Sequence, residues 1–129
     1  MARGTAHLEH GRAAEALAAD YLAGQGLSLF SRNFRARVGE LDLVMTDDNV
    51  LVVVEVRARR NATFTTPGAT IARVKQRRVI SATRYFLLRH RQFAGWPVRF
   101  DVVEISGELA DPVIRWSRAA FYVDDRTGN

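Results

Sequence analysis

A run of apolar residues, Leu51–Val54, leads directly into a carboxylate, Glu55, and then into Val56 and a group of arginines. Branched apolar residues that follow turn residues such as those at 47–49 are typical of a β-strand. A carboxylate flanked by valines is costly to bury unless a cation lies beside it. The stretch therefore predicts a strand whose glutamate meets either a basic side chain, in a structural ion pair, or a metal ion.

Other segments predict the elements around this strand. An alanine-rich amphipathic pattern predicts a helix from about Glu9 to Ala23, and a second helix is expected after Pro67-Gly68, from about Thr70 to Arg91. Strands are expected at 27–37, 39–45, 51–57 and 98–105, and residues 113–123 form either one more strand or an irregular closing segment. This order predicts a single α/β domain of residues 1–129, with its core at about 8–105 and a C-terminal tail at 106–129.

The composition excludes several kinds of protein. The chain contains no cysteine, so it has neither disulfides nor thiolate metal sites. Its N-terminal region carries scattered charges and no apolar segment of signal-peptide length, and no later run approaches the ~20 apolar residues of a membrane span. We therefore expect a cytoplasmic protein with no membrane contact.

Positive charge is concentrated in one block. Residues 56–100 hold eleven of the nineteen basic side chains and no acidic one. Such a block is either an ordinary solvated surface or a region that attracts polyanions, of which phosphate backbones are the commonest in a cell. The second alternative predicts a nucleic-acid partner, bound by arginines in and near the block: Arg35, Arg37, Arg59, Arg60, Arg73, Arg77 and Arg78.

Acidic residues alternate with apolar ones in the strand expected at 39–45. Because side chains two apart share a face, one face is expected to carry Glu40, Asp42 and Val44 and the other Leu41, Leu43 and Met45. The next strand, joined to it in a hairpin, would place Glu55 and Arg57 together on a face. Gathered carboxylates repel one another unless a divalent cation lies among them, and magnesium prefers oxygen ligands. A metal site therefore competes with an ion-pair network here.

Asp42, then twelve residues, then Glu55-Val56-Arg57, on a hairpin between two helices, resembles the active-site motif of the PD-(D/E)xK nuclease superfamily. Five segments in order, over about the first 105 residues, resemble the YraN family of bacterial proteins, which is similar to Holliday-junction resolvases: GRAAEALAADYL, GELDLV, LVVVEVRAR, RVKQRR and RFDVV. The resemblance implies a restriction-endonuclease-like αβββαβ core with a mixed central sheet flanked by helices. It also implies a metal-dependent endonuclease acting on DNA, such as branched or damaged structures in repair or recombination.

The resemblance assigns roles to the matching residues. Asp42 and Glu55 would bind Mg2+ or Mn2+ together with the backbone carbonyl of Val56, and Glu40 could supply a further oxygen ligand. Arg57 stands where nucleases of the superfamily usually carry a lysine. Arginine can supply charge and bind phosphate, but its pKa is too high for proton transfer.

Two more residues complete the candidate catalytic set. Glu15 matches a glutamate that junction resolvases carry on their first helix, although a glutamate at the shoulder of a helix would follow the same pattern. Lys75 is the one lysine of the chain and lies in an apolar row of the second helix, four residues from both Ile71 and Val79. We expect it to reach the carboxylates and to replace or assist Arg57; a lysine snorkelling at the edge of the core is the alternative.

Three functions remain open from the sequence. The first is a magnesium-dependent endonuclease, which by analogy with resolvases would act as a homodimer. The second is a non-catalytic nucleic-acid-binding module on a nuclease fold, and the third is a structural protein whose acids and arginines only pair with one another. Steep loss of DNA affinity with salt would separate the third function from the other two, and metal-dependent cleavage would separate the first from the second.

Overall fold

The computed structural model describes residues 2–59 and 71–123, and side chains from residue 11 onward within those ranges. The described chain forms two α-helices, one short 3-10 helix and five strands, in the order α1 (Ala2–Gly24), β1 (Ser28–Ala36), β2 (Gly39–Asp47), β3 (Val50–Arg59), α2 (Arg73–Arg89), η1 (Arg91–Phe93), β4 (Val98–Ser106) and β5 (Val113–Phe121). The segment at 113–123 is thus a strand, the first of the two alternatives.

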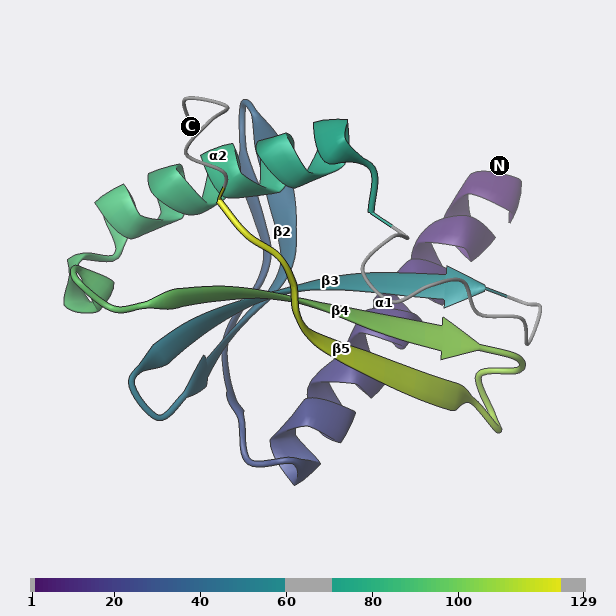
Figure 1. The fold of residues 1–129 in the computed structure, drawn as a ribbon. Coiled ribbons are helices and arrows are strands. Elements are labelled where there is room, and N and C mark those ends of the chain that lie inside the picture. Colours follow the sequence, from purple (N-terminus) through teal and green to yellow (C-terminus); the bar gives the residue numbers. More distant parts are fainter. Residues whose placement is uncertain (1, 60–70, 124–129) are drawn as a thin grey trace.

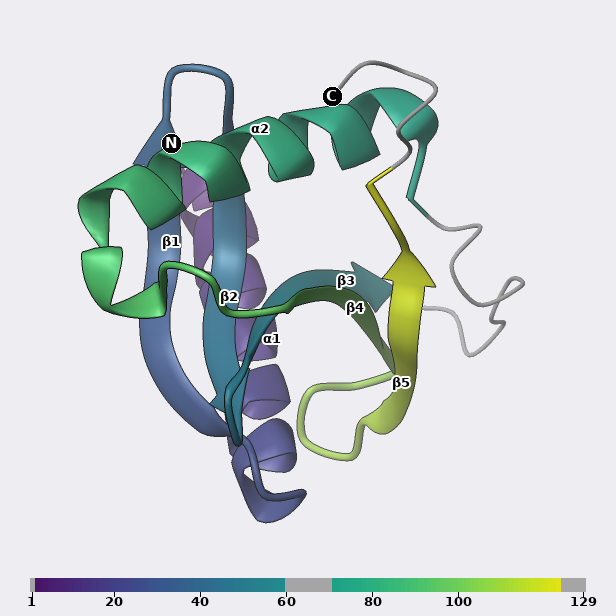
Figure 2. The same ribbon diagram turned by 60° about the vertical axis from the view of Figure 1, so that its left-hand side comes forward.

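The strands form one mixed sheet in the order β1-β2-β3-β4-β5. In this sheet β3 and β4 are parallel, and every other neighbouring pair is antiparallel. The helix α2 lies over one face and α1 over the other (Figures 1 and 2). The α/β fold with a mixed sheet between helices is confirmed, and it is consistent with a restriction-endonuclease-like core.

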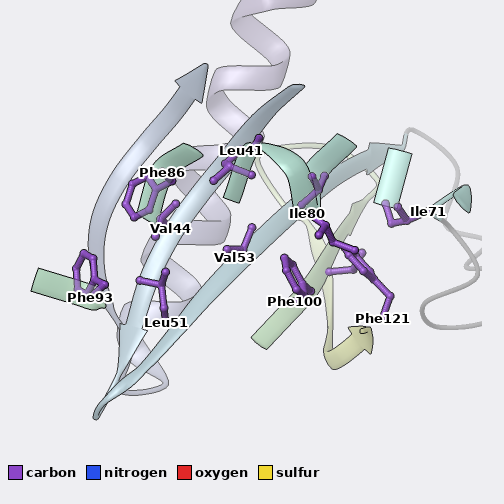
Figure 3. Packing of buried hydrophobic residues seen from close by; sticks show 13 residues of the cluster. Leu41, Val44, Leu51, Val53, Ile71, Ile80, Phe86, Phe93, Phe100 and Phe121 are labelled. Carbon is purple, nitrogen blue, oxygen red and sulfur yellow. The ribbon is translucent and has the colours of Figure 1, made fainter. Parts of the chain in front are cut away.

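Two apolar clusters fill the two layers, because the central strands are apolar on both faces. In β3, Leu51 and Val53 face α2, whereas Val52 and Val54 face α1. The cluster under α2 contains Phe86 together with residues of four strands, as Figure 3 shows. The cluster under α1 is built on Ala14, Ala18 and Leu22. A strand buried on both sides has little room for charge, so Glu55 needs a compensating group.

Both helices differ from their predicted bounds. The first begins at Ala2 rather than near Glu9, because residues 2–8 contain neither proline nor a run that would stop an alanine-rich helix. The second runs from Arg73 to Arg89. Its last turn ends where the backbone N–H of His90 donates to the carbonyl of Phe86, and the chain continues as η1. The residues Pro67, Gly68 and Thr70 lie outside the described residues.

The predicted alternation in β2 is wrong in part. Leu41 and Val44 both belong to the cluster under α2, whereas Leu43 and Met45 belong to the cluster under α1. Regular pleating would put residues 41, 43 and 45 on one face. The strand therefore changes face between Leu41 and Leu43, at Asp42. As a result, Val44 does not share a face of the sheet with Glu40.

A second irregularity lies between β4 and β5, where the register shifts next to Asp101. This buried carboxylate accepts two hydrogen bonds from the Arg99 guanidinium, one from Trp116 Nε1 and one from the backbone N–H of Ala119. Arg99 also reaches Asp47 of β2, at 3.4 Å. Asp101 is thus fully paired and stabilises the backbone at this shift of register.

No described helix combines the length and the apolar character that crossing a membrane requires.

Candidate active site

The candidate site lies where β2 and β3 separate. Their ladder runs from the Asp47–Val50 pair to the Leu43–Val54 pair and stops there. Beyond that point β2 continues beside β1, and β3 continues beside β4 as far as Arg59. In Figure 1, β2 turns up toward α2 while β3 runs on beneath it. We call this place the fork; its first unpaired residues are Asp42 on one strand and Glu55 on the other.

Asp42 bridges the two strands at the fork with its side chain. Its Oδ2 accepts a hydrogen bond of 2.9 Å from the backbone N–H of Val56, a donor that a continued ladder would have paired with a carbonyl. Burial raises the pKa of Asp42, and the negative charge of Glu40 adds to the rise. The hydrogen bond from Val56 and the positive charge of Lys75 act against it. The carboxylate is therefore held in place rather than free to rotate.

Glu55 is the most deeply buried acid of the site, with 1% of its surface exposed. Neither of its carboxylate oxygens accepts a well-formed hydrogen bond from a described residue, although the ammonium of Lys75 and the backbone N–H of Asp42 lie close enough to oppose the rise of its pKa. Burial, together with the neighbouring Asp42, raises the pKa of Glu55 to about 8. A carboxylate in an apolar layer without a well-formed hydrogen bond favours a cation or a bound proton.

Lys75 reaches this carboxylate from α2. Its Nζ lies 3.5 Å from Oε1 of Glu55, and the side chain is 51% exposed. The position agrees with the expectation that the single lysine approaches the acids from the helix; a role in chemistry stays a prediction. A half-exposed ammonium that touches a buried carboxylate can also contact a molecule that arrives from solvent.

Glu15 comes from the opposite layer, on α1, and is half-buried. Burial raises its pKa, and the nearby charge of Asp42 raises it further. The side chain of Asn33 donates a hydrogen bond to Glu15, which acts in the other direction. The fork thus receives one acid from the α1 side and one cation from the α2 side, with Asp42 and Glu55 between them.

Asn33 is a residue that the sequence reasoning missed. It lies in β1 opposite Asp42, between the pairs Arg32–Leu43 and Phe34–Leu41. Its φ of 52° is in the left-handed region, which asparagine tolerates better than most residues. Asn33 therefore lies beside the residue at which β2 changes face. An asparagine within a strand is unfavourable, and this mismatch was the available signal.

Glu104 was also missed. It lies in β4 opposite Arg57 on one side and Arg115 on the other, so three charged residues form a row across three strands. Glu104 is 1% exposed, and within the described chain neither of its oxygens accepts a hydrogen bond. Arg57, which lies partly buried, is therefore placed beside a second buried acid as well as two residues beyond Glu55.

The predicted phosphate-binding arginines are spread over the surface. Arg35 pairs with Glu40 at 3.2 Å, while Arg37 and Arg78 line a hollow with them. Arg73 and Arg77 are exposed in the first turns of α2, and Arg59 ends β3. Arg60 lies outside the described residues. The described arginines thus come from β1, the turn after it, the end of β3 and the first half of α2.

Asp42 and Glu55 suit a hard divalent cation, because carboxylate oxygens are the ligands that magnesium prefers. The oxygens of Glu55, which accept no well-formed hydrogen bond from a described residue and have the half-exposed Lys75 beside them, keep capacity to bind such a cation. The described residues contain no cluster of three acidic or histidine side chains able to hold a metal. A metal here would therefore need other oxygen ligands, for which the backbone carbonyl of Val56 and water are candidates.

The fold and the site define a class: an α/β protein with the arrangement of a restriction-endonuclease-like core and two acids at the point where its hairpin opens. Residues 14–105 match the model of the uncharacterised protein family UPF0102. The chain belongs to this family, which is the YraN family that its sequence motifs resemble.

Relatives support the assignment over most of the chain. A UPF0102 protein of Xanthomonas campestris is 46% identical over 120 residues, which are 93% of this chain and 97% of the relative. A UPF0102 protein of Alcanivorax borkumensis is 42% identical and covers 87% and 90%, and one of Legionella pneumophila is 40% identical and covers 88% and 94%. The family description states no activity, so function rests on the site.

Replacing Glu55 by glutamine should stabilise the metal-free protein, increasingly so as the pH rises. The folded-state pKa of about 8 exceeds the unfolded value of 4.5, so the native state holds an extra proton between these values and loses stability as the pH rises through them. By pH 9 we expect the free energy of unfolding of Glu55→Gln to exceed that of the native protein by roughly a few kcal/mol. Urea denaturation at pH 5, 7 and 9 in EDTA measures this. An equal difference at all three values would contradict the shifted pKa.

Two variants separate the contribution of the left-handed backbone at residue 33 from that of the side-chain amide of Asn33. Asn33→Gly keeps the conformation and loses the hydrogen bond to Glu15, whereas Asn33→Ala loses both. We expect the alanine variant to be less stable than the glycine variant by about 1 kcal/mol, the cost of a side chain in the left-handed region. Urea denaturation compares the two. An alanine variant as stable as the glycine variant would show that the strand accepts a regular conformation at this position.

Proposed function

We propose that this protein is a divalent-metal-dependent endonuclease that acts on DNA. The observation that carries the proposal is the fork, where Glu55 lies buried without a well-formed hydrogen bond, Asp42 is fixed beside it, and the one cation in contact with Glu55 among the described residues is the half-exposed Lys75. A second buried carboxylate beside Glu55, with a single long ion pair to share, costs stability that a purely structural site would avoid. An arrangement that costs stability and gathers acids in one place is typical of a ligand-binding or catalytic site.

Each residue has a distinct part in the proposed reaction. Asp42, Glu55 and the carbonyl of Val56 would hold the metal, which when bound would activate a water for attack on a phosphodiester. Lys75 would orient that water or a phosphate oxygen, because its ammonium is half-exposed and already touches Glu55. Arg57 would bind phosphate as a fixed positive charge. Glu15, whose pKa is raised, could hold a proton near the site.

The charge of the α2 side supports a nucleic-acid substrate. Residues 56–100 carry eleven basic side chains and no acidic one, and the described part of this block includes the helix that supplies Lys75. A substrate that approaches from this side would meet positive charge before it met the acids. DNA with branches or damage is the proposed substrate, since one compact domain can recognise backbone shape without reading bases. Cutting both strands of a junction would take two copies.

One observation favours a second function, a DNA-binding module without turnover. The ammonium of Lys75 already offsets part of the charge of Glu55, so the acid has a counter-charge with no metal bound. Arg57 cannot transfer protons in place of a lysine. In this case the basic surface would bind DNA and the acids would only stabilise the fork.

Cleavage of labelled duplex, flap and four-way-junction DNA separates the two functions. The native protein and Glu55→Gln are compared with magnesium, with manganese and with EDTA. Metal-dependent cleavage by the native protein, lost in the variant, supports the endonuclease. Salt-sensitive binding without cleavage by either would support the binding module, and the absence of DNA binding at low salt would overturn both functions.

Lys75→Met should abolish cleavage and leave the melting temperature nearly unchanged at pH 7. At that pH most Glu55 is protonated, because its pKa is raised to about 8, so the loss of a half-exposed ammonium costs little stability. Lys75→Arg is the matched control that keeps the charge. Retained cleavage by the methionine variant would show that Lys75 takes no part in the reaction, whereas a large loss of melting temperature would show that its role is structural.

A further inference from the structure

A surface hollow lies between the turn that joins β1 to β2 and the helix α2. Its volume is about 490 Å³, and the guanidinium-bearing residues Arg35, Arg37 and Arg78 line it together with Glu40. We propose that this hollow binds one backbone phosphate of the DNA, next to the phosphate that is cut. The inference rests on the proposed function and names a contact that the cleavage chemistry does not require.

The charges of the hollow favour an anion. Arg35 is neutralised by Glu40, at 3.2 Å. Arg37 and Arg78 have no carboxylate partner among the described residues, so two positive charges remain uncompensated in one small space. Like charges held together repel each other unless an anion joins them. Phosphate is the anion that guanidinium groups match best, because its oxygens accept two parallel N–H groups of one guanidinium.

The hollow is rigid because the turn packs tightly on the helix. A Cβ at Gly39 would lie only 2.8 Å from the backbone carbonyl oxygen of Arg78 and 3.1 Å from its Cβ. Glycine is therefore the residue that lets the two elements touch. The turn that carries Arg37 is thus held against the helix that carries Arg78, which places the Cα atoms of both arginines at the rim of the hollow.

The hollow adjoins the fork along both elements that form it. Glu40 lies two residues before Asp42 on β2, and its charge contributes to the raised pKa of Asp42. Arg78 follows Lys75 by three residues on α2, so the two residues are neighbours on one face of the helix. A DNA strand bound at the fork would thus run close to the hollow.

Three arginine variants test the site by DNA binding in EDTA, where no cleavage occurs. Arg37→Gln and Arg78→Gln remove the two uncompensated charges, and Arg89→Gln is the matched control, an exposed arginine in the last turn of the same helix. We expect each of the first two to weaken binding several-fold and to reduce the slope of log Kd against log salt by about one. Arg89→Gln should leave both quantities close to those of the native protein.

The double variant tells whether the two arginines share one phosphate. If they do, Arg37→Gln with Arg78→Gln should lower the salt slope no more than either change alone. A DNA in which a neutral methylphosphonate replaces the phosphate next to the cut should bind the native protein more weakly and the double variant with no further loss. Additive slopes, or an equal methylphosphonate effect on both proteins, would overturn the shared site.

Failure of this inference is distinguishable from failure of the proposed function. Strong, salt-sensitive DNA binding in which Arg37→Gln and Arg78→Gln behave like Arg89→Gln would overturn the hollow alone. A native protein that does not bind DNA at low salt would overturn both. All three side chains are exposed, so the variants should keep the native melting temperature, and a variant that does not is replaced by methionine at the same position, which also removes the charge.

Discussion

The hydrogen bond from the backbone N–H of Val56 to Asp42 is the interaction on which the site depends. Two paired strands cannot separate inside a protein unless the backbone groups they give up find other partners. The carboxylate of Asp42 takes one such donor at 2.9 Å, so β2 can follow β1 while β3 follows β4. The opening leaves Glu55 beside Asp42, with access for Lys75 from one helix and Glu15 from the other side of the sheet.

Asp101 makes the same kind of hydrogen bond to the backbone, but only to stabilise the fold. It too accepts a backbone N–H where a ladder is interrupted, but an arginine and a tryptophan complete its hydrogen bonds. Asp42 has the acids Glu40 and Glu55 beside it, and Glu55 accepts no well-formed hydrogen bond and contacts only the half-exposed Lys75 among the described cations. Two buried aspartates in one sheet thus differ in what surrounds them. The difference separates a carboxylate that completes a fold from carboxylates that can still take a ligand.

Local patterns predicted the elements and the approach of Lys75 to the acids, because helical and strand periods and a lone lysine in an apolar row are visible in the sequence. The mixed sheet was implied by the resemblance to the nuclease superfamily and not by these patterns. The change of face at Asp42 was not predictable. It lies opposite a left-handed residue in the neighbouring strand, Asn33, whose conformation strict alternation does not describe. Glu104 was hidden for a similar reason: its place beside Arg57 follows from the register of parallel strands far apart in sequence.

The residues of the fork come together at different stages of folding. Asp42 and Glu55 lie on one hairpin, whose contacts are short in sequence and can form early. Lys75 and Glu15 arrive on two helices that dock on opposite faces of the sheet. A partly folded chain that holds the hairpin alone would carry the two acids without the lysine. Assembly from three layers therefore ties the complete set of charges to the native state, and an incompletely folded copy lacks it.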